Sequence, residues 1–156
     1  MGADIGAVDM TLLIRDAAPG DLGQWQQLWQ DYLVFYKVTL DAAITDHTWA
    51  RLMSPDSRLK MRLALRDGRA VGFAIYHPHE STWVLGSDCY LEDLFVQSAV
   101  RGGGIGRALI DDLKVLATAR GWRRLYWHTD HDNARARKLY DSYAPADGAI
   151  RYRINL

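Results

Sequence analysis

The segment at residues 101–107 is the part of the sequence best suited to chemistry, because it reads Arg-Gly-Gly-Gly-Ile-Gly-Arg between a predicted strand and a predicted helix. Glycine permits positive φ angles, so successive backbone N–H groups can point into one concavity. The start of a helix adds unpaired N–H donors and a partial positive charge. We therefore expect the segment to bind phosphate oxygens, whereas an isolated pair of glycines would indicate only a turn.

Two other phosphate-binding loops can be tested on the same residues. A Walker loop needs Lys and then Ser or Thr after its last glycine, whereas Arg107 and Ala108 follow Gly106 here. A dinucleotide fingerprint of the form GxGxxG would need glycine at position 107 or 109, where Arg107 and Leu109 stand. The sequence excludes both loops.

A second group of candidate residues, Asn133, Arg137 and Tyr140, is spaced i, i+4 and i+7. This spacing places all three on one face of a predicted helix, where they could form one wall of a site. The alternative is that Tyr140 and Leu139 pack the helix against a sheet. Spacing alone leaves both interpretations open.

Apolar periodicity predicts the elements that position these residues. Leu22, Trp25 and Leu28 recur at helical spacing after Asp21, which we expect to cap that helix in a capping box with Gln24. Strands are predicted at 11–15, 60–66, 70–76, 89–96, 123–128 and 149–154, and helices at 22–35, 46–53, 105–120 and 132–143. This order predicts an α/β (α+β) fold in one domain at 11–156.

The overall composition narrows the classes of function. Lysine plus arginine (19) equal aspartate plus glutamate (19), so we expect neither a nucleic-acid nor a membrane partner. The single cysteine, Cys89, excludes an internal disulfide and fits a reducing compartment, so we expect a cytoplasmic protein. Residues 1–10 lack the apolar core of a secretory signal, and we interpret them as a flexible leader.

The residues that lead into the glycine segment match a known pattern. The strand Leu-Glu-Asp-Leu-Phe-Val at 91–96, followed by Arg-x-x-Gly-x-Gly at 101–106, resembles motif A of the GNAT family of N-acetyltransferases. The strand is similar to the branch that holds the diamine (spermidine/spermine) acetyltransferases and related histone and polyamine acetyltransferases. The resemblance extends over essentially the whole chain. It implies a GNAT fold: a central mixed, mostly antiparallel twisted sheet of six to seven strands, flanked by about four helices.

The segment at 133–140 resembles the family's Asn-x-x-Ala-x-x-Leu-Tyr run. In the family the Asn contacts pantetheine, and the Tyr hydroxyl lies beside the CoA sulfur as general acid. The resemblance implies these roles for Asn133 and Tyr140. The chain departs from the family at 141–145, which lacks the usual Gly-Phe pair, and this leaves the pairing of the last strand open.

The resemblance implies acetyl-CoA as the cosubstrate and no metal, and the pair His77 and His79 lacks a third metal ligand. Backbone groups of Leu94 and Val96 would pair with the pantetheine arm of CoA, and the amides at 102–107 would hold its pyrophosphate. The implied cofactor-binding residues are Leu94, Phe95, Val96, Arg101, Gly102, Gly103, Gly104, Ile105, Gly106, Arg107, Asn133, Ala136 and Arg137.

Two adjacent carboxylates, Glu92 and Asp93, could serve the amine that accepts the acetyl group. Deprotonating an alkyl ammonium with a pKa near 10.4 costs about 4 to 5 kcal/mol at pH 7, so the amine needs a base. A regular strand points the two side chains to opposite faces, and a bulge would change which one faces the acceptor. We predict Glu92 there, as base through water or as ammonium anchor, because the resembled branch uses this position. The predicted substrate-binding residues are Glu92, Asp93, Trp83 and His128.

Three classes of function remain open. An N-acetyltransferase for a small amine, whether polyamine, diamine or lysine-like, would act by direct attack with Tyr140 as general acid. A protein or histone-tail acetyltransferase would need a long acidic groove, which the neutral composition disfavours. A non-catalytic CoA-binding module would lack Tyr140 and Glu92, so we predict the first class. The resembled branch also implies a homodimer, with the C-terminal strand near its interface.

Overall fold

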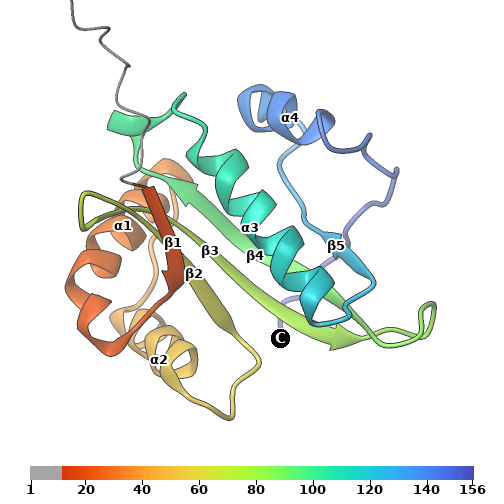
Figure 1. The fold of residues 1–156 in the computed structure, drawn as a ribbon, viewed down its shortest axis with the longest axis horizontal. Coiled ribbons are helices and arrows are strands. Elements are labelled where there is room, and N and C mark those ends of the chain that lie inside the picture. The colour runs from red at the N-terminus through yellow and green to blue at the C-terminus, as the bar shows by residue number, and fades with distance from the viewer. Residues whose placement is uncertain (1–11) are drawn as a thin grey trace, which may run out of the picture.

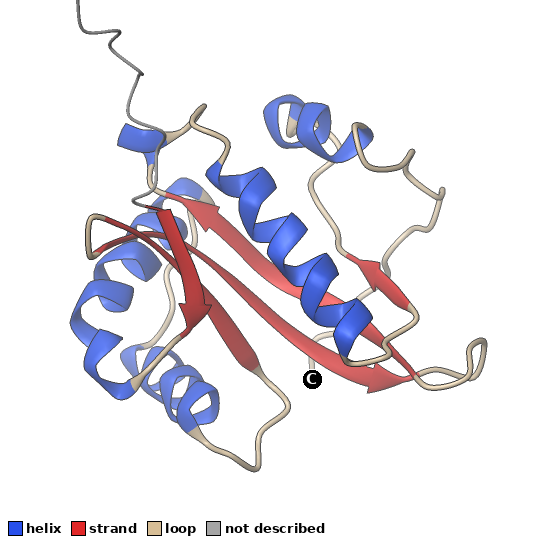
Figure 2. Ribbon diagram, in the orientation of Figure 1, coloured by secondary structure: helices blue, strands red, loops and turns tan. Residues whose placement is uncertain are grey.

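The computed structural model describes residues 12–156, so the predicted leader at 1–10 lies outside the described residues. These residues form a five-stranded sheet with helices on both faces (Figures 1 and 2). The strand order is β1-β2-β3-β4-β5, antiparallel except for the parallel pair β4 and β5. The elements are β1 (Leu12–Asp16), α1 (Leu22–Phe35), α2 (Ala42–Met53), β2 (Lys60–Arg66), β3 (Arg69–Glu80), β4 (Ser87–Val96), α3 (Ile105–Ala119), β5 (Arg124–Tyr126) and α4 (Ala134–Asp141).

The turn between β2 and β3 fixes the register of the central hairpin. Asp67 (φ 52°) and Gly68 (φ 76°) both adopt the left-handed conformation that a type I′ turn requires. β3 lies in the middle of the sheet, and its residues 71–76 are buried. This explains why the strand is almost entirely apolar in sequence.

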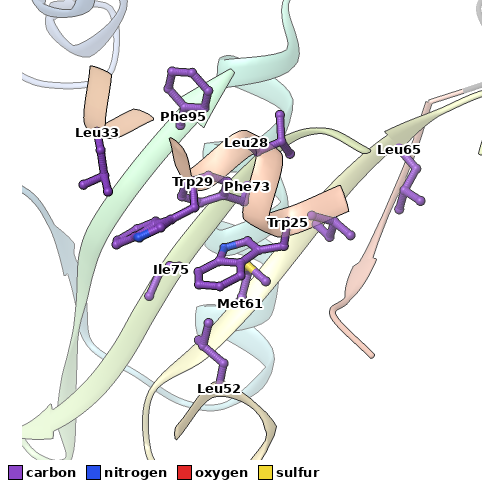
Figure 3. Packing of buried hydrophobic residues seen from close by; sticks show 11 residues of the cluster. Trp25, Leu28, Trp29, Leu33, Leu52, Met61, Leu65, Phe73, Ile75 and Phe95 are labelled. Atoms are coloured by element: carbon purple, nitrogen blue, oxygen red, sulfur yellow. The ribbon is translucent and has the colours of Figure 1, made fainter. Parts of the chain in front are cut away.

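Two apolar clusters cover the two faces of the sheet. Trp25, Trp29 and Phe73 belong to the cluster beneath α1 and α2 (Figure 3). Leu109 and Leu113 of α3 belong to the cluster on the opposite face, where residues of α4 also pack. Both tryptophan rings of α1 are buried in this core, since Trp25 is 0% and Trp29 6% exposed.

The sheet opens between β4 and β5. β5 pairs with β4 only at Asp88, Cys89 and Tyr90. From Leu91 onward, the edge of β4 that faces away from β3 has no strand partner in the described part of the chain. Figure 1 shows the two strands diverging toward α4. This opening leaves backbone groups of β4 beside a helix rather than inside a continuous sheet.

The expected strand at 149–154 is not formed, and the described residues therefore contain five strands instead of the six to seven predicted. Ile150, Tyr152 and Ile154 are 78%, 89% and 85% exposed. Their alternation is that of a strand with one apolar face. Nothing within residues 12–156 pairs with the segment, so the pattern does not become a strand in a single chain.

The predicted cap of the first helix and the predicted start of the second are also wrong. The Asp21 carboxylate accepts hydrogen bonds from Arg15 and from the Ala18 N–H instead of capping α1. The Gln24 side chain accepts a hydrogen bond from a backbone N–H of β3. α2 begins at Ala42, earlier than expected, because Asp41 caps it by accepting from its second residue at 2.9 Å. A local aspartate thus formed an ion pair in one case and a cap in the other.

Candidate active site

A first cavity of about 650 Å³ lies at the open end of β4, between the glycine segment and α4. Its residues come from the end of α1, from β4, from the segment at 101–107 and from α4. They are Phe35, Tyr36, Leu94, Phe95, Val96, Arg101, Gly102, Gly104, Ile105, Gly106, Arg107, Asn133, Arg135, Ala136, Lys138, Leu139, Tyr140 and Ser142.

The glycine segment contributes its backbone to this cavity. Gly102 (φ 88°) and Gly104 (φ 79°) adopt the left-handed conformation, which turns the chain sharply before α3. No side chain caps the N-terminus of α3 at Ile105. The first-turn N–H groups and the positive end of the helix dipole are therefore available at the cavity wall, where an anion would be stabilised.

The charge of the first cavity is one-sided. Arg101, Arg107, Arg135 and Lys138 line it, and no aspartate or glutamate does. The chain as a whole carries equal numbers of acidic and basic side chains. The fold has thus gathered positive charge at one place, which favours a ligand with several negative charges.

Arg101 is held in position by its neighbours. Its Nε donates to the backbone oxygen of Val96 at 2.9 Å, and its guanidinium lies over the rings of Phe35 and Phe95, 4.6 Å and 5.3 Å from their centroids. Burial, and to a lesser extent the nearby Arg135, lower the pKa of Arg101. An anion in the cavity would stabilise the charged guanidinium and so offset both effects.

The open edge of β4 also lines this cavity. The N–H of Gln97 donates to Val71 of β3 at 2.8 Å. Hydrogen-bonding direction alternates along an antiparallel strand, so the backbone groups of Leu94 and Val96 point to the opposite, open edge. The Leu94 backbone can therefore pair with an extended ligand in the manner of an added strand.

α4 provides the wall opposite β4. Asn133 begins the helix, because its Oδ1 accepts from the N–H of Ala136 at 3.3 Å. Tyr140 packs edge-to-face against Trp127, with ring centroids 5.4 Å apart. Burial, and secondarily the nearby Tyr36, raise the pKa of Tyr140 to about 12. The hydroxyl is therefore protonated at neutral pH and can donate a proton or a hydrogen bond.

A second cavity of about 570 Å³ lies between the sheet, α2 and the loop that follows α2, and both Glu92 and Asp93 line it. Asp93 pairs with Ile75 of β3 and Leu91 pairs with Tyr76, so Glu92 is the extra residue of a β-bulge. A regular strand would have separated the two carboxylates. The bulge instead brings both to one cavity.

The two carboxylates differ in their surroundings. Glu92 is 45% exposed, and its Oε2 lies 3.6 Å from Nε2 of His77. Asp93 is partly buried and accepts a hydrogen bond from the Tyr32 hydroxyl at 2.6 Å. Burial raises the pKa of Asp93 to about 6, although the Tyr32 hydrogen bond lowers it, and Glu92 adds to the rise. Asp93 is thus tied to α1, whereas Glu92 is accessible.

Four predicted site residues lie outside both cavities. The Arg137 guanidinium donates to the His131 backbone oxygen at 2.7 Å, and a Cβ at Gly103 would lie 3.3 Å from the Val100 backbone oxygen. Trp83 is 85% exposed in the turn between β3 and β4. His128 follows β5, with its Nδ1 3.1 Å from the Tyr90 hydroxyl. The structure therefore does not bring Trp83 and His128 to the carboxylates with which they were grouped. The residues outside both cavities are Gly103, Arg137, Trp83 and His128.

Sequence reasoning missed basic side chains in both cavities. Arg135 and Lys138 belong to the helix already singled out, and their charge beside an expected anion site was a usable signal. Arg51 and Arg58 line the second cavity, which exists only because α2 and its following loop fold over β3 and β4. Nothing in their local sequence indicates that position.

Residues 12–156 contain no cluster of three or more His, Cys, Asp or Glu side chains that could hold a metal ion. No helix in the same range is long and apolar enough to cross a membrane.

Comparisons with known proteins give the site its chemical context. A sequence model of the Acetyltransferase (GNAT) family matches residues 23–143. The chain is 33% identical over 150 residues to a D-amino-acid N-acetyltransferase from Saccharomyces cerevisiae, which covers 95% of this chain and 93% of that protein. It is 35% identical over 77 residues to a thialysine N-epsilon-acetyltransferase from Bos taurus, which covers 49% of this chain and 45% of that protein.

Solved structures show the same fold. An integron cassette protein from the mobile metagenome of V. cholerae superposes with a TM-score of 0.80 at 24% identity, covering 94% of this chain and 93% of that one. An aminoglycoside acetyltransferase from an uncultured soil metagenomic sample gives a TM-score of 0.80 at 21% identity, covering 96% and 99%. With the family match and the yeast relative, the chain belongs to the acetyltransferase (GNAT) family, whose members use acetyl-CoA as cosubstrate.

Proposed function

We propose that this protein transfers the acetyl group of acetyl-CoA to the primary amine of a small molecule, with CoA in the first cavity and the amine in the second. The observation that carries the proposal is the charge of the first cavity, which has four basic side chains and no acidic one in a chain of zero net charge. CoA is a polyanion with a long uncharged arm. The cavity offers cations, helix N–H groups and an open strand edge to match.

The fit divides along the cavity. Amides of Gly102, Gly104 and the first turn of α3 would bind the pyrophosphate, with Arg101 and Arg107 beside them. The Leu94 and Val96 backbone would pair with the pantetheine arm, and the Val96 oxygen would exchange its bond to Arg101 for one to that arm. The remaining cavity-lining residues of the predicted set are Phe95, Ile105, Gly106, Asn133 and Ala136.

Two side chains would carry the proton transfers. Acetyl-CoA supplies a thioester, whose acetyl carbon gains a bond to the amine nitrogen as the carbon–sulfur bond breaks. Glu92 would take the ammonium proton, directly or through water, and so give a neutral nucleophile. Tyr140 would donate its proton to the departing sulfur, and the second proton that the attacking nitrogen loses would pass through solvent and restore Tyr140. Asp93 stays bound to Tyr32 and keeps the carboxylate pair in place.

The second cavity supports a small acceptor over a protein tail. Residues of helix α2 and of its following loop line the cavity, whose volume of about 570 Å³ is in the range of small-molecule sites. The named relatives act on a D-amino acid and on thialysine, which are both small. A non-catalytic CoA-binding module would have no use for a bulge that presents two carboxylates.

The exposed segment after α4 supports a homodimer. Ile150, Tyr152, Ile154 and Leu156 alternate with polar residues and are each more than three-quarters exposed. A second copy could pair with this segment and cover its apolar face.

We place the enzyme in the cytoplasm because its single cysteine, Cys89, is buried and unpaired.

An acetylation assay tests the proposal. The purified chain would be mixed with acetyl-CoA and a panel of diamines, amino acids and peptide tails, and both thiol release and product mass would be measured. We expect at least one small amine to be acetylated, and Glu92→Gln to lower kcat/KM about 10²-fold or more at neutral pH. CoA binding without acetylation of any amine or peptide would show the non-catalytic module instead. Preferred acetylation of peptides would show a protein acetyltransferase.

A further inference from the structure

The second cavity carries charge of both signs, unlike the first. Glu92 and Asp93 line it from β4, while Arg51 in the last turn of α2 and Arg58 in the following loop line it from the other wall. Two acids and two bases thus stand on different elements around one space of about 570 Å³. A ligand that matches both walls must itself carry a positive and a negative end.

The two arginines have no structural partner that would explain them. Neither forms an ion pair or side-chain hydrogen bond with another residue in the range 12–156, whereas three other arginines are paired. Those paired arginines are Arg15 with Asp21 at 2.7 Å, Arg62 with Asp112 at 2.8 Å and Arg124 with Asp88 at 2.6 Å. Arg51 stabilises the C-terminal end of α2 through the helix dipole. Arg58 lies outside any helix, so the dipole does not account for it.

The chemistry of the guanidinium group selects the negative end of the ligand. Arginine presents a planar fork of donors that matches a carboxylate, and such charge-assisted bonds are stronger than neutral ones. A second ammonium group, as in a diamine, would instead meet two positive charges. Leu40, Ile44 and Leu59 line the same cavity and offer an apolar surface to the carbon chain between the two ends.

We propose that the acceptor of this enzyme is an amino acid, whose carboxylate binds Arg51 and Arg58 while its reacting amine lies at Glu92. The proposal rests on the acetyl-transfer function proposed above and narrows its substrate class. It separates a lysine-like acceptor from a diamine or polyamine. The arginines act as specificity-determining residues, since they contact the substrate away from the reacting nitrogen.

The experiment compares acceptors that differ only in the carboxylate. Steady-state kcat/KM would be measured for each enantiomer of lysine, for lysinamide, and for pentane-1,5-diamine, which is lysine without its carboxylate. We expect lysine of at least one hand to exceed both other compounds by about tenfold or more, as the loss of a charged hydrogen bond implies. A ladder of glycine, β-alanine, 4-aminobutyrate and 6-aminohexanoate would then report the spacing between arginines and reacting amine.

Variants locate the effect. Arg51→Gln and Arg58→Gln should each lower kcat/KM for lysine about tenfold, with little change for pentane-1,5-diamine. Arg120→Gln is the matched control, because Arg120 is exposed at the end of α3 and lines neither cavity. Thermal melts would check that all three variants fold. Equal use of lysine and the diamine, or equal losses for both in the variants, would overturn this inference alone. Acetylation of no amine at all would overturn the proposed function as well.

Discussion

Replacing Asp93 with asparagine should make the protein more stable at neutral pH and leave its stability in acid almost unchanged. Asp93 is partly buried, and burial raises its pKa from an ordinary value of 3.8 to about 6. One pKa unit corresponds to about 1.4 kcal/mol, so ionising this carboxyl in the folded state costs about 3 kcal/mol relative to the unfolded chain. Asparagine keeps an oxygen that can accept a hydrogen bond from the Tyr32 hydroxyl but carries no charge.

The pH dependence of this stability difference follows from proton binding at Asp93. Because the folded-state pKa of Asp93 is raised, the folded chain binds this proton more tightly than the unfolded chain between pH 3.8 and about 6. The contribution of this protonated carboxyl to the stability of the wild-type protein is therefore lost as pH rises through that window, and the Asp93→Asn variant has no such contribution to lose. Above about pH 6, the variant should be more stable by up to about 3 kcal/mol. Below pH 3.8, the difference should approach zero.

Urea unfolding monitored by tryptophan fluorescence would measure this difference from pH 3.5 to 8, since Trp25 and Trp29 report on the core beneath α1. Asp56→Asn is the matched control, because Asp56 is exposed in the loop after α2. It should change the free energy of unfolding little at any pH. An Asp93→Asn variant that is less stable than wild type at pH 8, or a difference independent of pH, would show that the ionised Asp93 carboxylate does not destabilise the fold.

Three further predictions concern the cofactor site and the assembly. Tyr140→Phe should lower kcat about 10²-fold with little change in the KM for acetyl-CoA, and full activity across pH would remove its role as general acid. Gly104→Ala and Gly68→Ala should each cost about 1 kcal/mol in urea unfolding, since both glycines have positive φ and open space at Cβ. Only Gly104→Ala should weaken CoA in calorimetry, and equal CoA affinity would contradict the role of the segment. Deleting residues 149–156 should convert a dimer to a monomer in analytical ultracentrifugation, whereas an unchanged mass would place the interface elsewhere.

The sequence predicted the backbone conformation of the glycine segment because the requirement for that conformation is local. Consecutive residues specify both the positive φ angles at Gly102 and Gly104 and the helix that starts directly after them. The same holds for the turn at Asp67 and Gly68. Most of the predicted cofactor-binding set therefore lines one cavity.

The residues of the second cavity could not be predicted in the same way, because their positions depend on how distant parts of the chain pair and pack. The bulge at Glu92 arises from the pairing of β4 with β3, and no residue type in the strand specifies it. Arg51 and Arg58 reach the second cavity through the path of α2 and its loop. Trp83 was predicted to bind the substrate, yet β3 and β4 are long enough to place it in an exposed turn.

The last strand shows a third kind of difference. Alternating apolar residues at 150, 152 and 154 predict a strand, and the pattern is present. A strand also needs a partner edge, and the described chain supplies none to this segment. An alternating pattern can therefore predict that a segment forms a strand, without identifying the chain that provides its partner strand.

The proposed function requires that the segment at 101–107 and the open edge of β4 bind CoA. Titration of the isotope-labelled chain with CoA, followed by the chemical shifts of assigned backbone amides, would locate this binding. We predict saturable shifts at Gly102, Gly104, Gly106 and Leu94, with one CoA bound per chain. Saturable binding whose shifts lie elsewhere, or no binding, would show that this segment and strand edge do not hold CoA.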